Sequence, residues 1–100
     1  MKIEMAEEAR AEFLAAIDWY NSVRPGLGAE FEAEVEDAIF AVEDNPKFCV
    51  EIEDGIRRCL VSRFPYALVY SIETERILIL AVMHTSRRPG FWHNRRPCQQ

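Results

Sequence analysis

The chain has 100 residues, of which 49% are hydrophobic and 29% charged, a balance typical of one folded domain and not of a disordered chain. The longest apolar run, residues 77–83, is far shorter than the roughly 20 residues of a membrane-spanning helix, so none is expected. The start of the chain is acidic and lacks the basic and apolar regions of a signal peptide. We therefore expect a cytoplasmic protein with a single domain over residues 1–100.

The net charge of −5 hides a split between the two halves of the chain. Residues 1–54 hold four Lys and Arg against 15 Asp and Glu, which gives −11, whereas residues 55–100 hold eight Arg and no Lys against two Glu, which gives +6. Such an asymmetry indicates a partner surface, and the planar group of arginine suits carboxylates and phosphates. The alternative is that the two halves neutralise each other within the fold.

The first half of the chain predicts a short strand followed by two helices. Residues 2–5 alternate polar and apolar side chains, which predicts the strand. Apolar residues then recur at three- and four-residue steps over residues 6–22 and again over residues 27–44, as on one face of a helix. The second helix ends at Asn45-Pro46, because the residue before a proline disfavours the helical conformation. The short break between the helices favours an antiparallel hairpin.

The second half predicts a sheet. After a loop over residues 46–55, three β-rich runs follow at residues 56–64, 67–72 and 76–84, and their short connections indicate an antiparallel meander. The third run is apolar on both faces, so we expect it to lie inside the sheet, covered on at least one side by the helices. The predicted fold is α+β, with a short N-terminal strand, a helical hairpin and a three-stranded antiparallel meander, the helices packed on one face of the sheet.

Motifs of the common catalytic and cofactor sites are missing from the sequence. There is no glycine-rich phosphate loop and no GxSxG motif, and the only histidines, His84 and His93, lie nine residues apart. The cysteines, Cys49, Cys59 and Cys98, contain no CxxC pair, so we expect reduced thiols without a special role. No cofactor and no metal are predicted.

One cluster, at residues 84–96, concentrates groups that bind partners. It combines two histidines, four arginines and the aromatic pair Phe91-Trp92, which we expect to be exposed. Arg57, Arg58 and Arg63 of the run 56–64 are candidates to join it, and alternation puts Arg58 on the opposite face from the other two. Such a set suits an anionic partner or a protein surface, since Arg and Trp are frequent interface anchors. The alternative is that the aromatic pair folds back onto the sheet edge and the arginines pair with the acidic helices.

The order of these segments resembles the RelE/ParE superfamily of bacterial toxins, which belong to type II toxin–antitoxin modules and are also called plasmid stabilisation proteins. The matching segments are Trp19-Tyr20, Asn45-Pro46, Ile56-Arg57-Arg58-Cys59-Leu60-Val61, Phe64-Pro65-Tyr66-Ala67-Leu68-Val69-Tyr70, residues 77–82, His84, Arg87-Arg88-Pro89 and Trp92. The resemblance covers nearly the whole chain. It implies the fold predicted above and a cognate antitoxin that lies across the toxin and neutralises it.

The superfamily has two main activities, and the resemblance favours the second. RelE-type toxins cut messenger RNA on the ribosome, whereas ParE-type toxins poison DNA gyrase and are not nucleases. The RelE branch places an arginine where this chain has Ala67 and a catalytic tyrosine near the place of Phe91 and Trp92. A net charge of −5 also works against entry into a site walled by RNA.

We therefore expect a ParE-like toxin that is not itself an enzyme and that binds and poisons DNA gyrase. One alternative is a RelE-like ribonuclease acting on ribosome-bound message without a metal, and another is an inactive, non-toxic interaction module. For a ribonuclease, the matching residues are an incomplete catalytic set of His84, Arg87, Arg88, Arg58 and Arg63.

The same residues, together with two aromatic anchors, are the predicted surface for the target or the antitoxin. The full set is Arg58, Arg63, Tyr70, His84, Arg87, Arg88 and Trp92. An antitoxin segment is expected to dock there as an added strand or an amphipathic helix, with Tyr70 and Trp92 as anchors. We expect no membrane partner and no direct sequence-specific binding to DNA.

Overall fold

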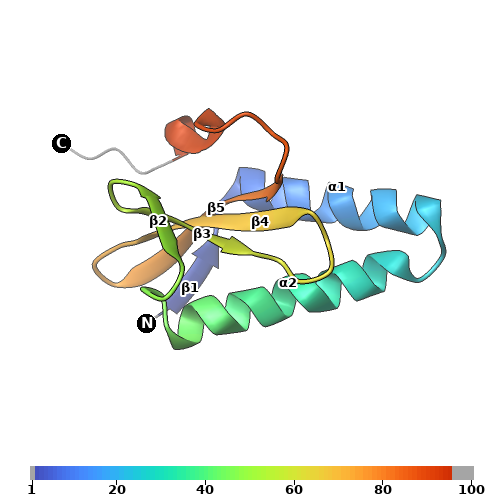
Figure 1. Ribbon diagram of the computed structural model, residues 1–100, viewed down its shortest axis with the longest axis horizontal. Helices are drawn as coiled ribbons and strands as arrows, with labels where there is room; N and C mark the ends of the chain where they lie inside the picture. Colours follow the sequence, from blue (N-terminus) through green and yellow to red (C-terminus); the bar gives the residue numbers. More distant parts are fainter. Residues whose placement is uncertain (1, 96–100) are drawn as a thin grey trace.

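The computed structural model of the chain describes residues 2–95. Its elements, in chain order, are β1 (Lys2–Met5), α1 (Glu7–Val23), α2 (Leu27–Asp44), β2 (Val50–Glu53), β3 (Ile56–Leu60), β4 (Tyr66–Ile72), β5 (Arg76–His84) and the 3-10 helix η1 (Phe91–Arg95). The strands form one sheet in the order β1-β5-β4-β3-β2. β1 runs parallel to β5, and all other neighbours are antiparallel. Figure 1 shows α2 on one side of this sheet and η1 on the other.

The predicted fold class is confirmed, with two corrections in the region of residues 46–64. The segment expected to be a loop contains β2, because the chain reverses at Gly55, whose φ is 76°, and Val50 then pairs with Arg58. The strand expected to reach residue 64 ends at Leu60, because Arg63 lies in a turn with a φ of 71°. The sheet therefore has four strands after the helices, where the sequence predicted three.

The helical hairpin covers one face of the sheet and builds the main core. Phe31 and Val35 of α2 are fully buried in one apolar cluster with Leu68 and Tyr70 of β4. At the hairpin turn the two helices come so close that Gly28 donates its backbone N–H to the side-chain oxygen of Asn21 at 2.8 Å. Apolar burial of this kind contributes about 25 cal/mol per Å², so the hairpin and sheet stabilise each other.

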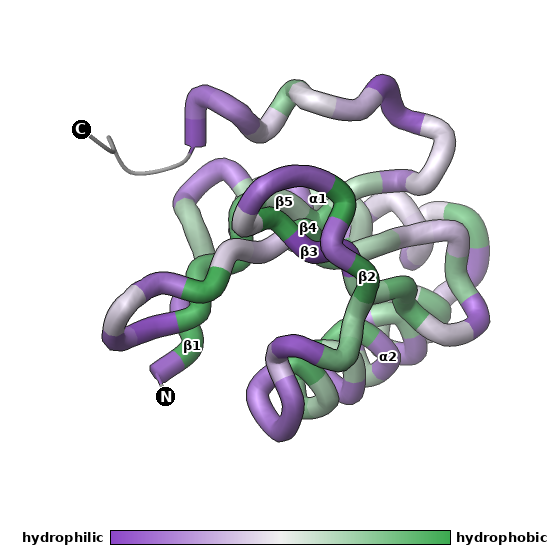
Figure 2. Tube along the Cα trace, turned by 60° about the vertical axis from the view of Figure 1, so that its left-hand side comes forward, coloured by the Kyte–Doolittle hydropathy of each residue, from purple (hydrophilic) through white to green (hydrophobic). Residues whose placement is uncertain are grey.

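β5 lies between β1 and β4, as its apolar sequence predicted, and it is covered on both faces. A bulge at Leu80, between the pairs Tyr70–Ile79 and Val69–Ala81, shifts the alternation of its side chains. Ile77, Ile79 and Val82 thus face the helices, whereas Leu78, Leu80 and Met83 belong to a second cluster on the far face. In Figure 2 hydrophobic colour lies around the labels β4 and β5 in the middle of the sheet, whereas β1 and β3 also carry hydrophilic colour.

The segment after β5 closes the far face of the sheet. Trp92 of η1 is only 1% exposed and packs in the second cluster with Ile56 and Val69. The expectation of an exposed aromatic pair is therefore wrong, and the alternative, in which this pair folds back onto the sheet, describes the structure. Within residues 2–95, no helix combines the length and the apolarity needed to cross a membrane. Arg96 and Cys98 lie outside the described residues.

Most of the described arginines of the basic half are paired with carboxylates of the acidic half. Ion pairs join Arg57 to Glu51, Arg63 to Glu30 and Glu34, Arg76 to Glu4, and Arg87 and Arg95 to Glu12. The charge asymmetry is thus largely neutralised within the fold. The side chains of Arg58 and Arg88 make no ion pair and no hydrogen bond with the described residues.

Candidate functional site

A groove lies between α1 and the end of the sheet where β4 begins and β5 ends. Its volume is about 660 Å³, and it is lined by Glu12, Ala15, Ala16, Trp19, Tyr20, Pro65, Tyr66, Val82, Met83, His84 and Arg87. The antiparallel pairing of Tyr66 with His84 brings the two strand ends together, and the α1 residues face them at helical spacing. Two of the residues predicted from the sequence, His84 and Arg87, lie in this groove.

The walls of the groove are aromatic. The ring of Trp19, which is 59% exposed, stands edge-on to Tyr20 at a centroid distance of 5.0 Å. Tyr66 meets the ring of His84 edge-on at 5.4 Å. Burial raises the pKa of the Tyr66 phenol, and the negative charge of Glu12 adds to this effect. Tyr66 is therefore a neutral hydrogen-bonding group near pH 7 and not an anionic base.

His84 is held in one orientation by the turn that follows β5. Its Nδ1 accepts the backbone N–H of Ser86 at 3.1 Å and lies 2.8 Å from the Ser86 hydroxyl oxygen. Because a backbone N–H can only donate, Nδ1 carries no proton in this arrangement, and the neutral ring keeps its proton on Nε2. His84 is exposed and its Nε2 has no partner among the described residues, so this group is free to meet a ligand.

Glu12 connects the groove to the segment after β5. Its side chain is 17% exposed and accepts the backbone N–H of Val82 at 3.1 Å, an Arg87 N–H at 3.0 Å and Arg95 N–H groups at 2.9 Å. The ring of Phe91 lies against both guanidinium groups, with its centroid 3.6 Å from Arg87 Cζ and 4.9 Å from Arg95 Cζ. Arg87 is thus already engaged, and a phosphate would have to compete with a carboxylate for it.

Arg63 lies at the same end of the sheet as the groove but faces α2. Its guanidinium binds Glu30 at 2.9 Å and Glu34 at 3.2 Å. The hydrogen bond from Arg63 is the main reason that the pKa of Glu30 falls below its ordinary value, and burial opposes it. This turn therefore anchors α2 to the sheet and does not extend the groove.

The remaining predicted residues do not join the groove. Arg58 shares the far face of the sheet with Ile56 and pairs across to Val69 of β4. Arg88 is exposed on the segment after β5. The two predicted anchors are both buried and offer no surface to a partner in this conformation, which corrects that expectation. Tyr70 is 0% exposed and donates its hydroxyl to the Pro46 carbonyl at 2.6 Å, while Trp92 packs under η1.

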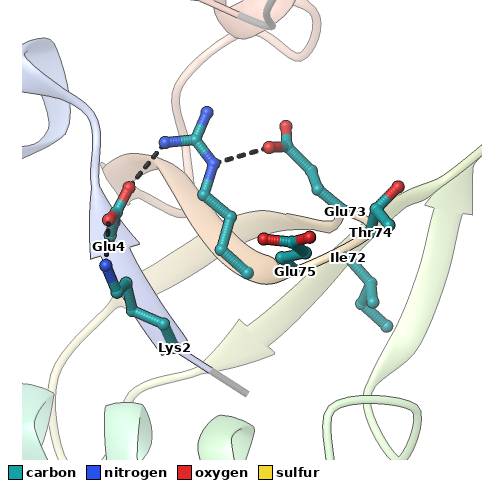
Figure 3. Close-up of a pocket in the computed structure, with 7 residues that line it drawn as sticks. Lys2, Glu4, Ile72, Glu73, Thr74 and Glu75 are labelled. Atoms are coloured by element: carbon teal, nitrogen blue, oxygen red, sulfur yellow. Dashed lines mark hydrogen bonds and ion pairs between the residues drawn. The ribbon is translucent and has the colours of Figure 1, made fainter.

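A second, polar pocket lies at the opposite end of the sheet, beside β1 and the turn between β4 and β5. It has a volume of about 650 Å³, and Figure 3 shows Lys2 and Glu4 on one side with Glu73 and Glu75 on the other. Arg76 binds Glu4 at 2.5 Å and Glu73 at 2.7 Å, so its charge is satisfied from both sides. The pocket is therefore an ion-pair network that fastens β1 to β5. No group of three or more metal-ligating side chains occurs within residues 2–95.

Three residues of the groove region were missed by reasoning from the sequence. Glu12 lies at a three- to four-residue step from Ala9 and Ala16, so an acid on the apolar face of a helix was the available signal for a buried partner. Trp19 is a large aromatic residue near the end of a helix, and it lies outside the apolar face of that helix. Tyr66 follows a proline turn, and only the pairing of β4 with β5 brings it to His84.

The fold agrees with the resemblance noted in the sequence. A helical hairpin packed on a sheet with one parallel edge strand is the architecture that the resemblance to RelE/ParE toxins implied. A solved structure described as the chromosomal ParDE toxin–antitoxin system from P. aeruginosa superposes with a TM-score of 0.75 at 16% sequence identity, over 84% of this chain and 95% of that chain. At this identity the likeness shows the fold alone.

The family follows from the sequence comparison. The family model described as the ParE toxin of the type II toxin–antitoxin system, parDE, matches residues 3–89. The chain therefore belongs to the ParE toxin family. No curated protein sequence is a significant match to it. The matched range ends before η1, so Trp92 and Arg95 lie outside the part that the family model describes.

Proposed function

We propose that this ParE-type toxin binds and poisons DNA gyrase in the cytoplasm, without catalysing a reaction itself, and that a cognate antitoxin neutralises it. The observation that carries the proposal is the match to the ParE family over residues 3–89. The groove supports it, because an open cavity with an exposed tryptophan suits the insertion of a side chain from a protein partner.

The chemistry of the groove also favours binding over RNA cleavage. Cleavage without a metal needs a base, an acid and cationic groups for the developing phosphate charge. The groove supplies His84 and a neutral Tyr66, but its cation, Arg87, is paired with Glu12 at 3.0 Å. One observation still favours a ribonuclease as the second candidate, since a histidine, a tyrosine and an arginine share one cavity.

The first experiment combines the purified protein with DNA gyrase, ATP and supercoiled plasmid, and scores linear DNA on a gel. Linear DNA that requires both proteins is the expected result. Reactions lacking either protein are the controls. If folded protein gives no linear DNA but cuts message on ribosomes, with cleavage lost in His84→Gln, the ribonuclease replaces the gyrase poison as the function.

The groove itself is tested by Trp19→Ala in the same assay. Because Trp19 is 59% exposed, its truncation leaves the fold intact, and a central aromatic anchor contributes about 2 kcal/mol or more to an interface. We expect at least about a tenfold loss of potency on gyrase. Phe40→Ala is the matched control, since Phe40 is a 71% exposed aromatic residue on α2 and does not line the groove. Equal potency of the two variants would exclude the groove as the gyrase contact.

Arg58 and Arg88 are proposed contacts for the antitoxin. Both are cations without an ion-pair partner among the described residues, so an acidic segment gains their charges without breaking an existing pair. In a co-expression assay, Arg58→Glu combined with Arg88→Glu is expected to keep toxicity and to weaken neutralisation. An antitoxin whose binding segment is strongly basic would contradict this assignment.

A further inference from the structure

Cys49 directly precedes β2 and Cys59 lies in β3, so two of the three cysteines are next to the pairing of these two strands. Val50 pairs with Arg58, and Glu51 pairs with Arg57. Continuing this register by one step sets Cys49 against Cys59. Opposed residues of an antiparallel pair have Cα atoms about 4.5–5.5 Å apart, which falls within the range of about 4.4–6.8 Å found in disulfides.

The two thiols also point to the same side of the sheet. Cys59 belongs to the cluster between sheet and helices, and Cys49 packs against that same cluster. The neighbouring Cys49 is one of the causes that raise the pKa of Cys59, after burial. Both cysteines are free, with Cys49 partly exposed and Cys59 buried.

The backbone at Cys49 is held in place by side chains of the sheet. Arg57 donates one N–H group to the carbonyl of Cys49 at 2.7 Å and to that of Lys47 at 3.0 Å. The Tyr70 hydroxyl donates to the Pro46 carbonyl at 2.6 Å, just upstream. The segment that leads into β2, with the backbone of Cys49, is therefore fixed against β3 and β4.

We propose that Cys49 and Cys59 are a site of reversible oxidation, at which a low-molecular-weight disulfide such as oxidised glutathione converts the two thiols into a cross-strand disulfide. The Cys49 thiolate attacks one sulfur of the oxidant, whose S–S bond breaks and releases one reduced thiol. The Cys59 thiolate then attacks the sulfur of Cys49 and releases the second. The protein loses two protons and two electrons, and the oxidant gains them as two thiols.

The environments of the two cysteines fix the order of these steps. Burial, and to a lesser degree the neighbouring Cys49, raises the pKa of the Cys59 thiol to about 12, so Cys59 is a poor first nucleophile. The partly exposed Cys49 meets the oxidant instead. Once Cys49 is a mixed disulfide, its share of the effect on the Cys59 pKa disappears. Burial still opposes the second step, and that step is favoured because it is intramolecular. The proposal replaces the expectation that these thiols have no special role, and it does not depend on the gyrase target.

The test uses the full chain with Cys98→Ser, which removes the third thiol. The folded protein is equilibrated in buffers of reduced and oxidised glutathione, its remaining thiols are alkylated, and the intact mass and a non-reducing peptide map are measured. We expect a monomer that has lost both free thiols and two hydrogens, with a peptide that joins residues 49 and 59. Circular dichroism before and after oxidation is expected to report the same fold.

The matched controls are the same background with Cys49→Ser or Cys59→Ser, in which no internal disulfide is possible. They are expected to remain reduced, to carry glutathione, or to form dimers that reductant dissolves. The proposal is overturned if the Cys98→Ser protein keeps both thiols in oxidising buffer, stops at a glutathione adduct, or forms the disulfide only after denaturant has unfolded it.

Discussion

At the scale of single residues, Glu12 accepts a backbone hydrogen bond from β5 at a point where no neighbouring strand does so. The parallel pairing of β1 with β5 ends near Met5, and the last contact of that edge is the N–H of Ala6 on the carbonyl of Ile79 at 2.8 Å. Beyond it, β5 would present unpaired backbone groups. Glu12 accepts the N–H of Val82, and Arg95 donates to the carbonyl of Leu80 at 3.1 Å. Two side chains thus satisfy the exposed edge of an interior strand.

Replacing Glu12 by alanine tests this role. The change leaves the Val82 N–H and the 13% exposed Arg95 side chain without their acceptor, so we expect a loss of about 2–4 kcal/mol in the free energy of unfolding. Urea denaturation of the two proteins measures it. Glu36→Ala, at an exposed position of α2 without a hydrogen bond or ion pair to the described residues, is expected to stay within about 0.5 kcal/mol. Equal stabilities would show that Glu12 is dispensable.

The contact between Arg63 and Glu30 predicts a dependence of stability on pH. The pKa of Glu30 is lowered from 4.5 in the folded protein, chiefly by the hydrogen bond from Arg63. Its contribution is therefore complete above pH 4.5 and is lost as the pH falls through the lowered value. Arg63→Gln removes the charge that lowers the pKa. We expect the variant to lose less stability than the wild type between pH 5 and pH 3, as measured by urea denaturation across this range. A parallel decline in the two proteins would contradict the assignment.

At the scale of elements, the close contact of the two helices depends on Gly28. A Cβ at this position would lie 2.5 Å from the Ile17 carbonyl oxygen, a backbone atom that cannot move aside. We expect Gly28→Ala to cost about 1–3 kcal/mol, measured by thermal and urea denaturation. Gly26→Ala is the control, because no atom lies within 4 Å there and only its φ of 90° opposes a side chain, at about 1–2 kcal/mol. A small loss of stability in Gly28→Ala would mean that the two helices can move apart to accept the side chain.

η1 is held to the sheet by Trp92, whose indole N–H finds no hydrogen-bond partner in the described part of the chain. Trp92→Ala removes a fully buried ring, so we expect a loss of about 3–5 kcal/mol. Trp92→Phe removes the unsatisfied donor along with part of the ring, and the two effects offset each other to within about 1 kcal/mol. Urea denaturation distinguishes the variants. If Trp92→Phe is as unstable as Trp92→Ala, the indole group makes a contact that the phenyl ring cannot replace.

Elements with a strong apolar period were predictable from the sequence, and elements made by tertiary contact were not. Residues 2–5, 27–44 and 76–84 have the bounds that their patterns predicted. β2 is only four residues long, and three of them are exposed, so nothing local distinguishes it from a loop until β3 pairs with it. η1 is placed by the packing of Trp92 on the far face of the sheet, a tertiary contact that no periodicity in this segment predicts.

At the scale of the whole molecule, the groove was only half predictable. His84 and Arg87 come from one short segment and were found together, but Glu12 and Trp19 reach them only through the packing of α1 on β5. The arginines of residues 55–100 were also only partly predictable, because a count of charges does not distinguish an unpaired cation from one in an ion pair. In the fold, five described arginines of the basic half meet carboxylates of the acidic half, and the unpaired Arg58 and Arg88 lie away from the groove.

The pairing of β1 with β5 has a consequence for synthesis on the ribosome. Lys2 pairs with Arg76 and Met5 with Ile79, so β1 has no partner strand until β5, which follows both helices in the chain, has been made. At about 5–20 residues per second, several seconds pass in which both helices exist without the strand on which they pack. A chain released before His84 lacks His84 and Arg87, so the groove is complete only after β5 and the residues that follow it have been made.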